Sequence, residues 1–424
     1  PGFVMGIIKI YSSTAPTGTF ASTISNNTIT LQYGYSFSGS ASLHGIVNTW
    51  GAISMVPGSA TINISNNNLF NFSVLASGTH MYGISNGIVA SSLNINSNIF
   101  RGNTSSASLA GFTGILNTGS ADNININNNK LGDASGNAIT FSGVTSGDLN
   151  GISCPVAGNN ATLSISGNNF QGFIQNVTGS GNHNYIKFAH ATASAITDNI
   201  NNNTFTNITA NTSGNVTFIE RSGVMALNAG ATENCNNNSI VTGFSKPDGN
   251  GTVTFYNAAS ASLSGNTMVQ TGNNFSNINF PNVNAMVGWN NSEGDPITGD
   301  GPTKTITSNV FTNWILGQGK ATVIQLTCAG NNSSVSGNNI STLTSSSSFD
   351  DILGINLGIS VQPGIITCSS NTIADIIAGN GANVTGIQSE SFSNDRNISS
   401  NTISGLSTTG FSATTKGISI KQGS

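Results

Sequence analysis

The sequence predicts an all-β fold, a parallel β-solenoid of about twelve coils, and three observations lead to this prediction. A six-residue motif with a fixed asparagine recurs along the chain of 424 residues. Short runs of alternating polar and apolar residues precede the motif, as in a strand with one buried face. Asparagine, glycine, serine and threonine are poor helix formers, and the 64 Asn and 51 Gly residues disfavour long helices. Repeated short strands that cannot bury their apolar side alone are typical of a solenoid.

The motif has the form apolar-x-x-Asn-x-apolar, and residues 24–29 are its first copy. Twelve copies follow one another at spacings of 28 to 43 residues, with a mean of 34. The asparagines at the fourth place are Asn27, Asn67, Asn98, Asn129, Asn168, Asn203, Asn238, Asn266, Asn309, Asn338, Asn371 and Asn401. An amide side chain both donates and accepts hydrogen bonds, and asparagine tolerates the left-handed backbone of a sharp corner. We therefore expect a structural Asn ladder at one corner of the coil.

Each unit is expected to contain three strands in a fixed order. The first strand often contains a Gly-Ile pair, as at Gly83-Ile84, and precedes the motif by about half a unit. The second strand alternates and ends in the motif, as in residues 161–165. The third strand follows the asparagine, and seven copies place a further apolar residue three positions on, as Phe72 follows Leu69. Loops of variable length between these strands account for the unequal spacings.

A three-strand coil of more than 25 residues with an asparagine corner resembles the right-handed parallel β-helix of the pectate-lyase-like superfamily, over roughly residues 20–420. The resemblance implies a right-handed coil but no particular activity, because that superfamily contains lyases, hydrolases, phage tailspikes, adhesins and purely structural coils. The low charge and the richness in Asn, Ser, Thr and Gly also resemble the adhesins and extracellular filament proteins of bacterial surfaces. This second resemblance implies an extracellular location at the bacterial cell surface.

The composition excludes two classes of partner. Charged residues make up 6% of the chain, and its 11 Lys and Arg residues leave a net charge of −4. No basic surface is available to neutralise phosphates, so nucleic acid is not an expected partner. No apolar run reaches the roughly 18 residues of a membrane-spanning helix, so we expect no membrane insertion in this segment.

Ionisable residues are too few and too scattered for a convincing catalytic constellation, and we expect neither enzyme activity nor a cofactor. The densest region is a candidate surface patch of His183, Lys187, His190, Glu220 and Arg221. Lys187 and Glu220 are expected to point outward and stack as an exposed ion pair. The alternative is a polysaccharide-contacting or catalytic patch. If Ile219 faces inward, Arg221 does so too unless the strand has ended, and the register stays open at this point.

A Gly/Pro-rich loop carries Glu293, Asp295 and Asp300, which form a weak candidate calcium site. The alternative is an acidic turn without metal, and this is the reading we favour. Trp289 beside the loop either stacks on a sugar or, as we favour, is a loop aromatic that folds back on the coil. Trp314 occupies a core-type position and is expected to be buried.

The four cysteines are expected to be free. Cys235 and Cys368 replace the first apolar residue of the motif, so they are expected to behave as small core residues. Four coils at about 4.8 Å would separate them by about 19 Å, which is too far for a disulfide. Cys154 and Cys328 lie five coils apart.

Residues 1–424 are predicted to form a single β-helix domain that is open at both ends, because no capping helix is recognisable. We expect a segment of a longer chain or a stacking subunit. The leading functional hypothesis is a non-catalytic extracellular rod in a filament or adhesin stalk, with copies of itself or adjoining coils as partners. The alternative is a polysaccharide-binding or polysaccharide-degrading β-helix. A column of carboxylates or aromatic side chains across three or more coils would favour the alternative.

Overall fold

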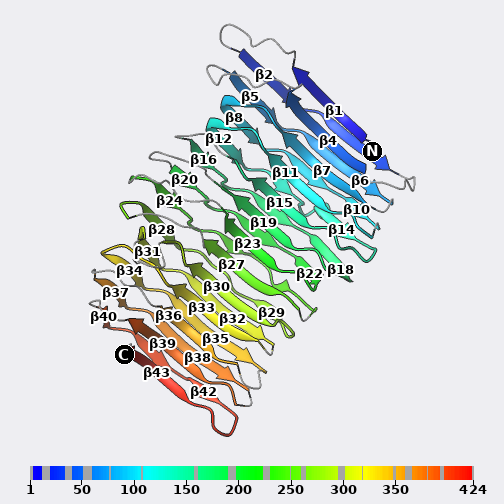
Figure 1. Ribbon diagram of the computed structural model, residues 1–424. Helices are drawn as coiled ribbons and strands as arrows, with labels where there is room; N and C mark the ends of the chain where they lie inside the picture. The colour runs from blue at the N-terminus through cyan, green and yellow to red at the C-terminus, as the bar shows by residue number, and fades with distance from the viewer. Residues whose placement is uncertain are drawn as a thin grey trace.

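The chain forms a parallel β-solenoid with about 34 residues per turn, seen in a computed structural model (Figure 1). The structure describes residues 3–11, 20–33, 41–50, 60–75, 78–106, 108–156, 161–189, 197–222, 230–248, 250–258, 264–294, 301–317, 319–346, 350–358, 365–379, 381–391 and 396–422. The strands of these segments belong to three sheets, which we call A, B and C, and they pair in parallel. The described residues contain no helix long and apolar enough to cross a membrane.

Successive coils contribute neighbouring strands to each sheet, so residues far apart in sequence lie side by side. Sheet A consists of β1 (Phe3–Tyr11), β4 (Ala41–Trp50), β7 (Thr79–Asn86), β11 (Phe112–Asn117), β15 (Leu149–Cys154), β19 (His183–Phe188), β23 (Val216–Arg221), β27 (Thr252–Ala258), β30 (Ala285–Asn291), β33 (Lys320–Leu326), β36 (Ile352–Leu357), β39 (Val384–Ser391) and β43 (Thr415–Gln422). Sheet B consists of β2 (Phe20–Ser25), β5 (Ala60–Ser65), β8 (Ala90–Asn96), β12 (Ala121–Asn127), β16 (Thr162–Ser164), β20 (Thr197–Asn199), β24 (Thr232–Asn234), β28 (Thr267–Thr271), β31 (Thr303–Thr307), β34 (Ser333–Ser336), β37 (Ile366–Ser369) and β40 (Arg396–Ser399). Sheet C consists of β3 (Thr28–Tyr33), β6 (Asn68–Val74), β9 (Ile99–Arg101), β10 (Asn103–Ser105), β13 (Lys130–Leu131), β14 (Ile139–Phe141), β17 (Asn169–Gln171), β18 (Phe173–Gly179), β21 (Thr204–Thr206), β22 (Ile208–Thr212), β25 (Ser239–Ile240), β26 (Phe244–Ser245), β29 (Ile278–Phe280), β32 (Val310–Leu316), β35 (Asn339–Ser345), β38 (Thr372–Ala378), β41 (Thr402–Ser404) and β42 (Ser407–Thr408).

The predicted order of strands within a coil is confirmed. The Gly-Ile strand lies in sheet A, the alternating strand in sheet B, and the strand after the asparagine in sheet C. Glycine is required in sheet A because the interior is narrow there. A Cβ atom on Gly83 would lie 2.2 Å from a ring atom of Phe100 and 2.4 Å from the carbonyl oxygen of Gly114. The glycine therefore makes room for the sheet C side chain that crosses the interior.

Sheet C has more strands than the other two because a bend divides it in several coils. Gly102 separates β9 from β10 and Gly172 separates β17 from β18, with φ of 68° at both. Asn71 makes a similar bend inside the undivided strand β6, between Leu69 and Phe72, with a φ of 54°. A left-handed residue at the bend lets both apolar side chains face the core, and Leu69 and Phe72 are both buried.

The asparagine ladder is present and runs along the corner between sheets B and C. The backbone N–H and the Nδ2 of Asn67 both donate to Oδ1 of Asn98 in the next coil, at 3.0 Å each. The same Nδ2 also donates to the carbonyl oxygen of Ile24 in the preceding coil. The pattern repeats at the neighbouring corners, as in the bonds from Asn98 to Asn129. Each buried amide therefore satisfies its own polar atoms and a turn N–H as well.

The prediction that Asn266 belongs to the ladder is wrong. Asn238 donates instead to Oδ1 of Asn273, and Asn273 donates to Asn309, at 2.9 to 3.0 Å. Asn266 accepts a bond from the backbone N–H of Ala231. The true copy escaped the pattern because it begins with a polar residue, Gln270.

The corrected ladder makes the coils more uniform. The two spacings around Asn273 are 35 and 36 residues, in place of the predicted 28 and 43. Gln270 is accommodated in the core because Trp289 Nε1 donates to its Oε1 at 2.6 Å and Asn291 exchanges two hydrogen bonds with it. A buried amide with these partners replaces the usual apolar residue without an unsatisfied polar group.

The left-handed backbone of the corner belongs to the residue before the ladder asparagine. We had expected the ladder asparagine itself to adopt this conformation, and that expectation was wrong. Asn26, Ser97 and Gly272 stand at this third place of the motif, with φ of 59°, 58° and 69°. Asn and Gly are the residues that adopt this conformation most readily. The ladder asparagine therefore supplies hydrogen bonds, and its predecessor makes the turn.

A second, shorter ladder lies at the end of the first sheet A strands. Asn48 Nδ2 donates to Oδ1 of Asn86 at 2.6 Å, and Asn86 Nδ2 donates to Oδ1 of Asn117 at 2.8 Å. All three residues are buried. Asn117 also contacts Sγ of Cys154, which takes the equivalent position in the next strand. The repeated Gly-Ile-x-Asn sequence is the signal that could have predicted it.

Candidate functional site

A polar hollow on the outer face of sheet A encloses about 330 Å³. It runs from Asp148, just before β15, across β19, β23 and β27, and these four strands lie side by side in Figure 1. We call it the sheet A groove. Its lining residues are Asp148, Asn182, Asn184, Lys187, Asn215, Thr217, Glu220, Thr252, Thr254 and Asn257.

The strand register places the floor of the groove in two rows that run across the strands. Asn184, Thr217 and Thr254 are register partners in β19, β23 and β27, and they form the first row. The second row contains Lys187 and Glu220, which are likewise partners. Both rows face outward because two consecutive inward residues separate them in each strand, Tyr185 and Ile186 in β19 and Phe218 and Ile219 in β23.

The ion pair expected between Lys187 and Glu220 is confirmed. Lys187 Nζ lies 3.1 Å from a Glu220 carboxylate oxygen, and the side chains are 34% and 20% exposed. A cross-strand pair at this exposure contributes about 0.2–1 kcal/mol to stability. Because the charges of Lys187 and Glu220 cancel, this pair adds no net charge to the centre of the groove.

A chain of hydrogen bonds fixes the rim of the groove. The carboxylate of Asp148 accepts from the backbone N–H of Asn182 at 2.8 Å. Oδ1 of Asn182 accepts from the N–H of Asn215 at 3.0 Å. Oδ1 of Asn215 accepts from both the N–H and the hydroxyl of Thr252. The rim side chains are exposed, yet each is held by its neighbour in the adjoining coil.

The five residues of the predicted surface patch do not form one surface. His183 is buried, and its Nε2 lies 2.7 Å from Gln175 Oε1. Burial lowers the pKa of His183 to about 3, with a smaller contribution from Lys246. Arg221 is also buried, because β23 continues to this residue and the inward alternation is kept. His190 lies outside the described residues.

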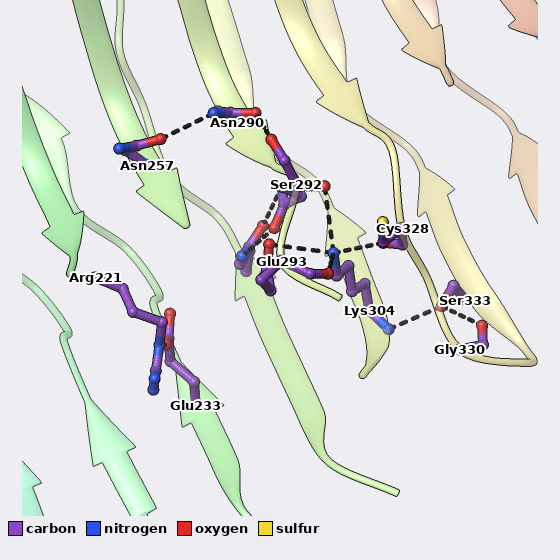
Figure 2. Close-up of polar contacts among 12 residues, drawn as sticks. Arg221, Glu233, Asn257, Asn290, Ser292, Glu293, Lys304, Cys328, Gly330 and Ser333 are labelled. Atoms are coloured by element: carbon purple, nitrogen blue, oxygen red, sulfur yellow. Dashed lines mark hydrogen bonds and ion pairs between the residues drawn. The ribbon is translucent and has the colours of Figure 1, made fainter. Parts of the chain in front are cut away.

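Arg221 belongs to a buried charged cluster between sheets A and B. Its Nη2 lies 2.5 Å from the Asp198 carboxylate, and its Nε donates to the carboxylate of Glu233. The hydroxyl of Tyr256 donates to the other Glu233 oxygen. Burial alone would lower the pKa of Arg221, but the carboxylates of Glu233 and Asp198 raise it above its usual range. Figure 2 shows Arg221 facing Glu233 inside the coil.

A second buried pair, Lys304 and Glu293, occupies the next part of the same corner (Figure 2). Lys304 Nζ lies 3.2 Å from the Glu293 carboxylate and donates to the carbonyl oxygens of Cys328, Glu293 and Asn291 at 2.5, 3.1 and 3.3 Å. Burial raises the pKa of Glu293 to about 7, although Lys304 opposes the shift. The ammonium group of Lys304 thus fills the space between these three carbonyl oxygens.

The candidate calcium loop is not supported by the position of Glu293, whose side chain is fully buried against Lys304. Asp295 and Asp300 lie outside the described residues. Within the segments that the structure describes, no group of three or more His, Cys, Asp or Glu residues is arranged to hold a metal ion.

Both readings of Trp289 were wrong, because this residue lies in strand β30 and is buried. Its ring stacks on Tyr256 at 5.1 Å between centroids, with an interplanar angle of 17°. Trp314 is buried as predicted, and its Nε1 donates to the carbonyl oxygen of Phe275 at 2.7 Å. These residues belong to an aromatic core in the middle coils and are unavailable to a ligand.

The predicted state of the cysteines is confirmed. Cys154, Cys235, Cys328 and Cys368 are buried and free. Burial raises the pKa of the Cys154 thiol to about 11, so the thiol form is favoured.

An aromatic cluster also lies on the outer face of sheet A, near the first coils. Tyr82 stacks on His44 with centroids 4.5 Å apart, and His80 lies 4.3 Å from Tyr82. His80 is further fixed by a hydrogen bond with Thr113. Because the rings stack on one another, their flat faces are occupied, and we do not regard them as a sugar platform.

Comparisons with protein-family models, curated proteins and solved structures give no match for this chain. The class of protein therefore rests on its own geometry, a parallel β-solenoid with buried asparagine hydrogen bonding and a polar groove on sheet A.

Proposed function

We propose that this protein is a non-catalytic structural rod of the bacterial cell surface, part of a filament or adhesin stalk. Its coils continue end to end, either within one longer chain or between copies. Twelve coils at about 4.8 Å give a rod roughly 55–60 Å long. The extracellular location rests on the resemblance to surface repeat proteins.

The observation that carries the proposal is the unbroken stacking of the described coils. Each ladder asparagine bonds to the ladder asparagine of the next coil, as from Asn27 to Asn67, from Asn67 to Asn98 and from Asn371 to Asn401. One apolar core runs through the same coils. Coils that each support the next in this way form an extended rod, which suits a stalk.

Electron microscopy of the purified protein tests stacking between copies, with a charge placed on β43, where Ile420 is 69% exposed. We expect Ile420→Asp to shorten or abolish end-to-end assemblies while the melting temperature stays near that of the wild type. The matched control is Ile315→Asp, at a 53% exposed site on the outer face of sheet C, and it should assemble normally. Equal assembly of both variants would contradict the proposal.

A further inference from the structure

We propose that the outer face of sheet B binds the surface of an ice crystal. This inference goes beyond the structural role, because it assigns a ligand to the side of the rod. It depends on the register of the outward side chains, on their chemistry and on the rigidity of the sheet that carries them.

Five threonines form an unbroken column across the middle of this face. They lie in β16, β20, β24, β28 and β31, strands that follow one another in Figure 1. Each threonine is the register partner of the next, and the column consists of Thr162, Thr197, Thr232, Thr267 and Thr303. Neighbouring strands are about 4.8 Å apart, so the hydroxyls recur at about this interval along the rod. Within the described segments, no hydrogen bond engages the hydroxyls of the middle three, Thr197, Thr232 and Thr267.

The array also repeats along the strands. Outward residues recur at every second position, which is about 6.6 Å along a strand. In β31 they are Thr303, Thr305 and Thr307. A second column runs through Ser164, Asn199, Asn234, Val269 and Thr305, and a third through Asn201, Asn236, Thr271 and Thr307. The lattice repeats of hexagonal ice along its two kinds of axis are of similar size to these two intervals.

The face is polar but uncharged. The charged residues of these five strands are Asp198, Glu233 and Lys304, and all three are buried. Their partners Arg221 and Glu293 also lie in the interior. A polyanion would therefore find no cation on the face, whereas the lattice of ice carries no charge. Each water molecule of that lattice donates and accepts hydrogen bonds, and so does a threonine hydroxyl.

The three columns also lack the side chains that usually anchor a protein partner. Such anchors are mostly tryptophan, tyrosine and arginine. The outward positions of the five strands hold threonine, serine and asparagine, with one valine at Val269. A regular surface of short side chains suits a crystal lattice better than the uneven surface of another protein.

The face is rigid before any ligand arrives. Threonine is branched at Cβ, so its side chain has few rotamers. Side-chain ladders also favour a flat sheet over a twisted one. The asparagine ladder borders sheet B at this point, and Asn168, Asn203 and Asn238 each donate to the next ladder residue at 2.9 to 3.1 Å. Binding therefore requires little ordering of the protein.

Slow growth of ice from a dilute solution of the folded protein tests the proposal. The fraction of the protein taken into the ice is compared with that of an unrelated protein of similar mass. We expect the wild type to be enriched, and we expect Thr232→Tyr and Thr267→Tyr each to lose the enrichment, because a large ring in the column holds the ice away from its neighbours. The matched control is Thr209→Tyr, at an outward, half-buried site in β22 of sheet C, and it should keep the enrichment. Melting temperatures near that of the wild type show that the variants are folded.

Four results would overturn the inference. Three concern ice, and they are a wild type no more enriched than the unrelated protein, enrichment that neither sheet B variant lowers, and an equal loss of enrichment in the Thr209→Tyr control. The fourth is the finding, by sedimentation velocity near the freezing point, of dimers that Thr232→Tyr abolishes, which would assign the face to a second copy of the chain. None of them bears on end-to-end assembly, which Ile420→Asp tests separately.

Discussion

At the scale of single residues, the ladder asparagine gives each coil its register. Its side chain accepts two hydrogen bonds from the coil before and donates to the coil after, while its Nδ2 also caps a carbonyl group. No other side chain of this size supplies two acceptor and two donor positions in one plane, apart from the longer glutamine. This explains why a polar residue recurs in the interior without weakening it.

Asn168→Ala or Asn238→Ala is expected to lower the free energy of unfolding by about 1–3 kcal/mol, because buried turn groups lose their partners. Both side chains are fully buried. Asn94→Ala is a suitable control, since Asn94 lies half-exposed on the outer face of sheet B and donates to Asn63 there. Urea denaturation checks the prediction, and unchanged unfolding of both ladder variants would contradict it.

The carboxyl group of Glu293 should make stability depend on pH. Its pKa is raised by burial to about 7, above the ordinary value of 4.5, so the folded state holds the proton more tightly than the unfolded state. Its stabilising contribution is therefore complete below about pH 4.5 and is lost as the pH rises through about 7. We expect the melting temperature of the wild type, relative to Glu293→Gln, to fall between pH 5 and pH 8. A constant difference across this range would show that Glu293 does not titrate there.

At the scale of elements, sheet B shows how charges enter the core without breaking the strand pattern. Leu163, Asp198 and Glu233 are register partners in β16, β20 and β24 and share one inward position. Lys304 is inward in β31. The alternation alone could have predicted these positions, because each charged residue lies two places before the first residue of the motif. We assigned no role to them because charged side chains seldom face a core.

Arg221→Met should be strongly destabilising, by about 3–5 kcal/mol, because it removes the cation that both carboxylates of the cluster contact. The triple change of Arg221→Met with Asp198→Leu and Glu233→Leu should recover most of this loss, since Leu163 fills the equivalent position one coil earlier. Thermal unfolding of the single and triple variants provides the comparison. A triple variant as unstable as the single one would mean that the ionic contacts themselves stabilise the coil.

At the scale of the whole molecule, the coil could be predicted from sequence because its signals are local. Strand alternation, the glycine of sheet A and the motif asparagine each specify a short element, and stacking follows from their repetition. The eighth copy of the motif was placed wrongly because its true first residue, Gln270, is polar. Gln270 is stable in the core through Trp289 and Asn291, which lie 19 and 21 residues away, so no local pattern reveals it. The groove could not be predicted either, since it depends on how outward side chains of four neighbouring coils lie against one another.

The central proposal is that copies of this rod stack end to end. Cryo-electron microscopy of the purified protein tests it most directly. We predict long, uniform filaments with an axial repeat of about 4.8 Å and an unbroken ladder across each junction. Discrete single rods of about 60 Å that do not associate at any concentration would contradict the claim.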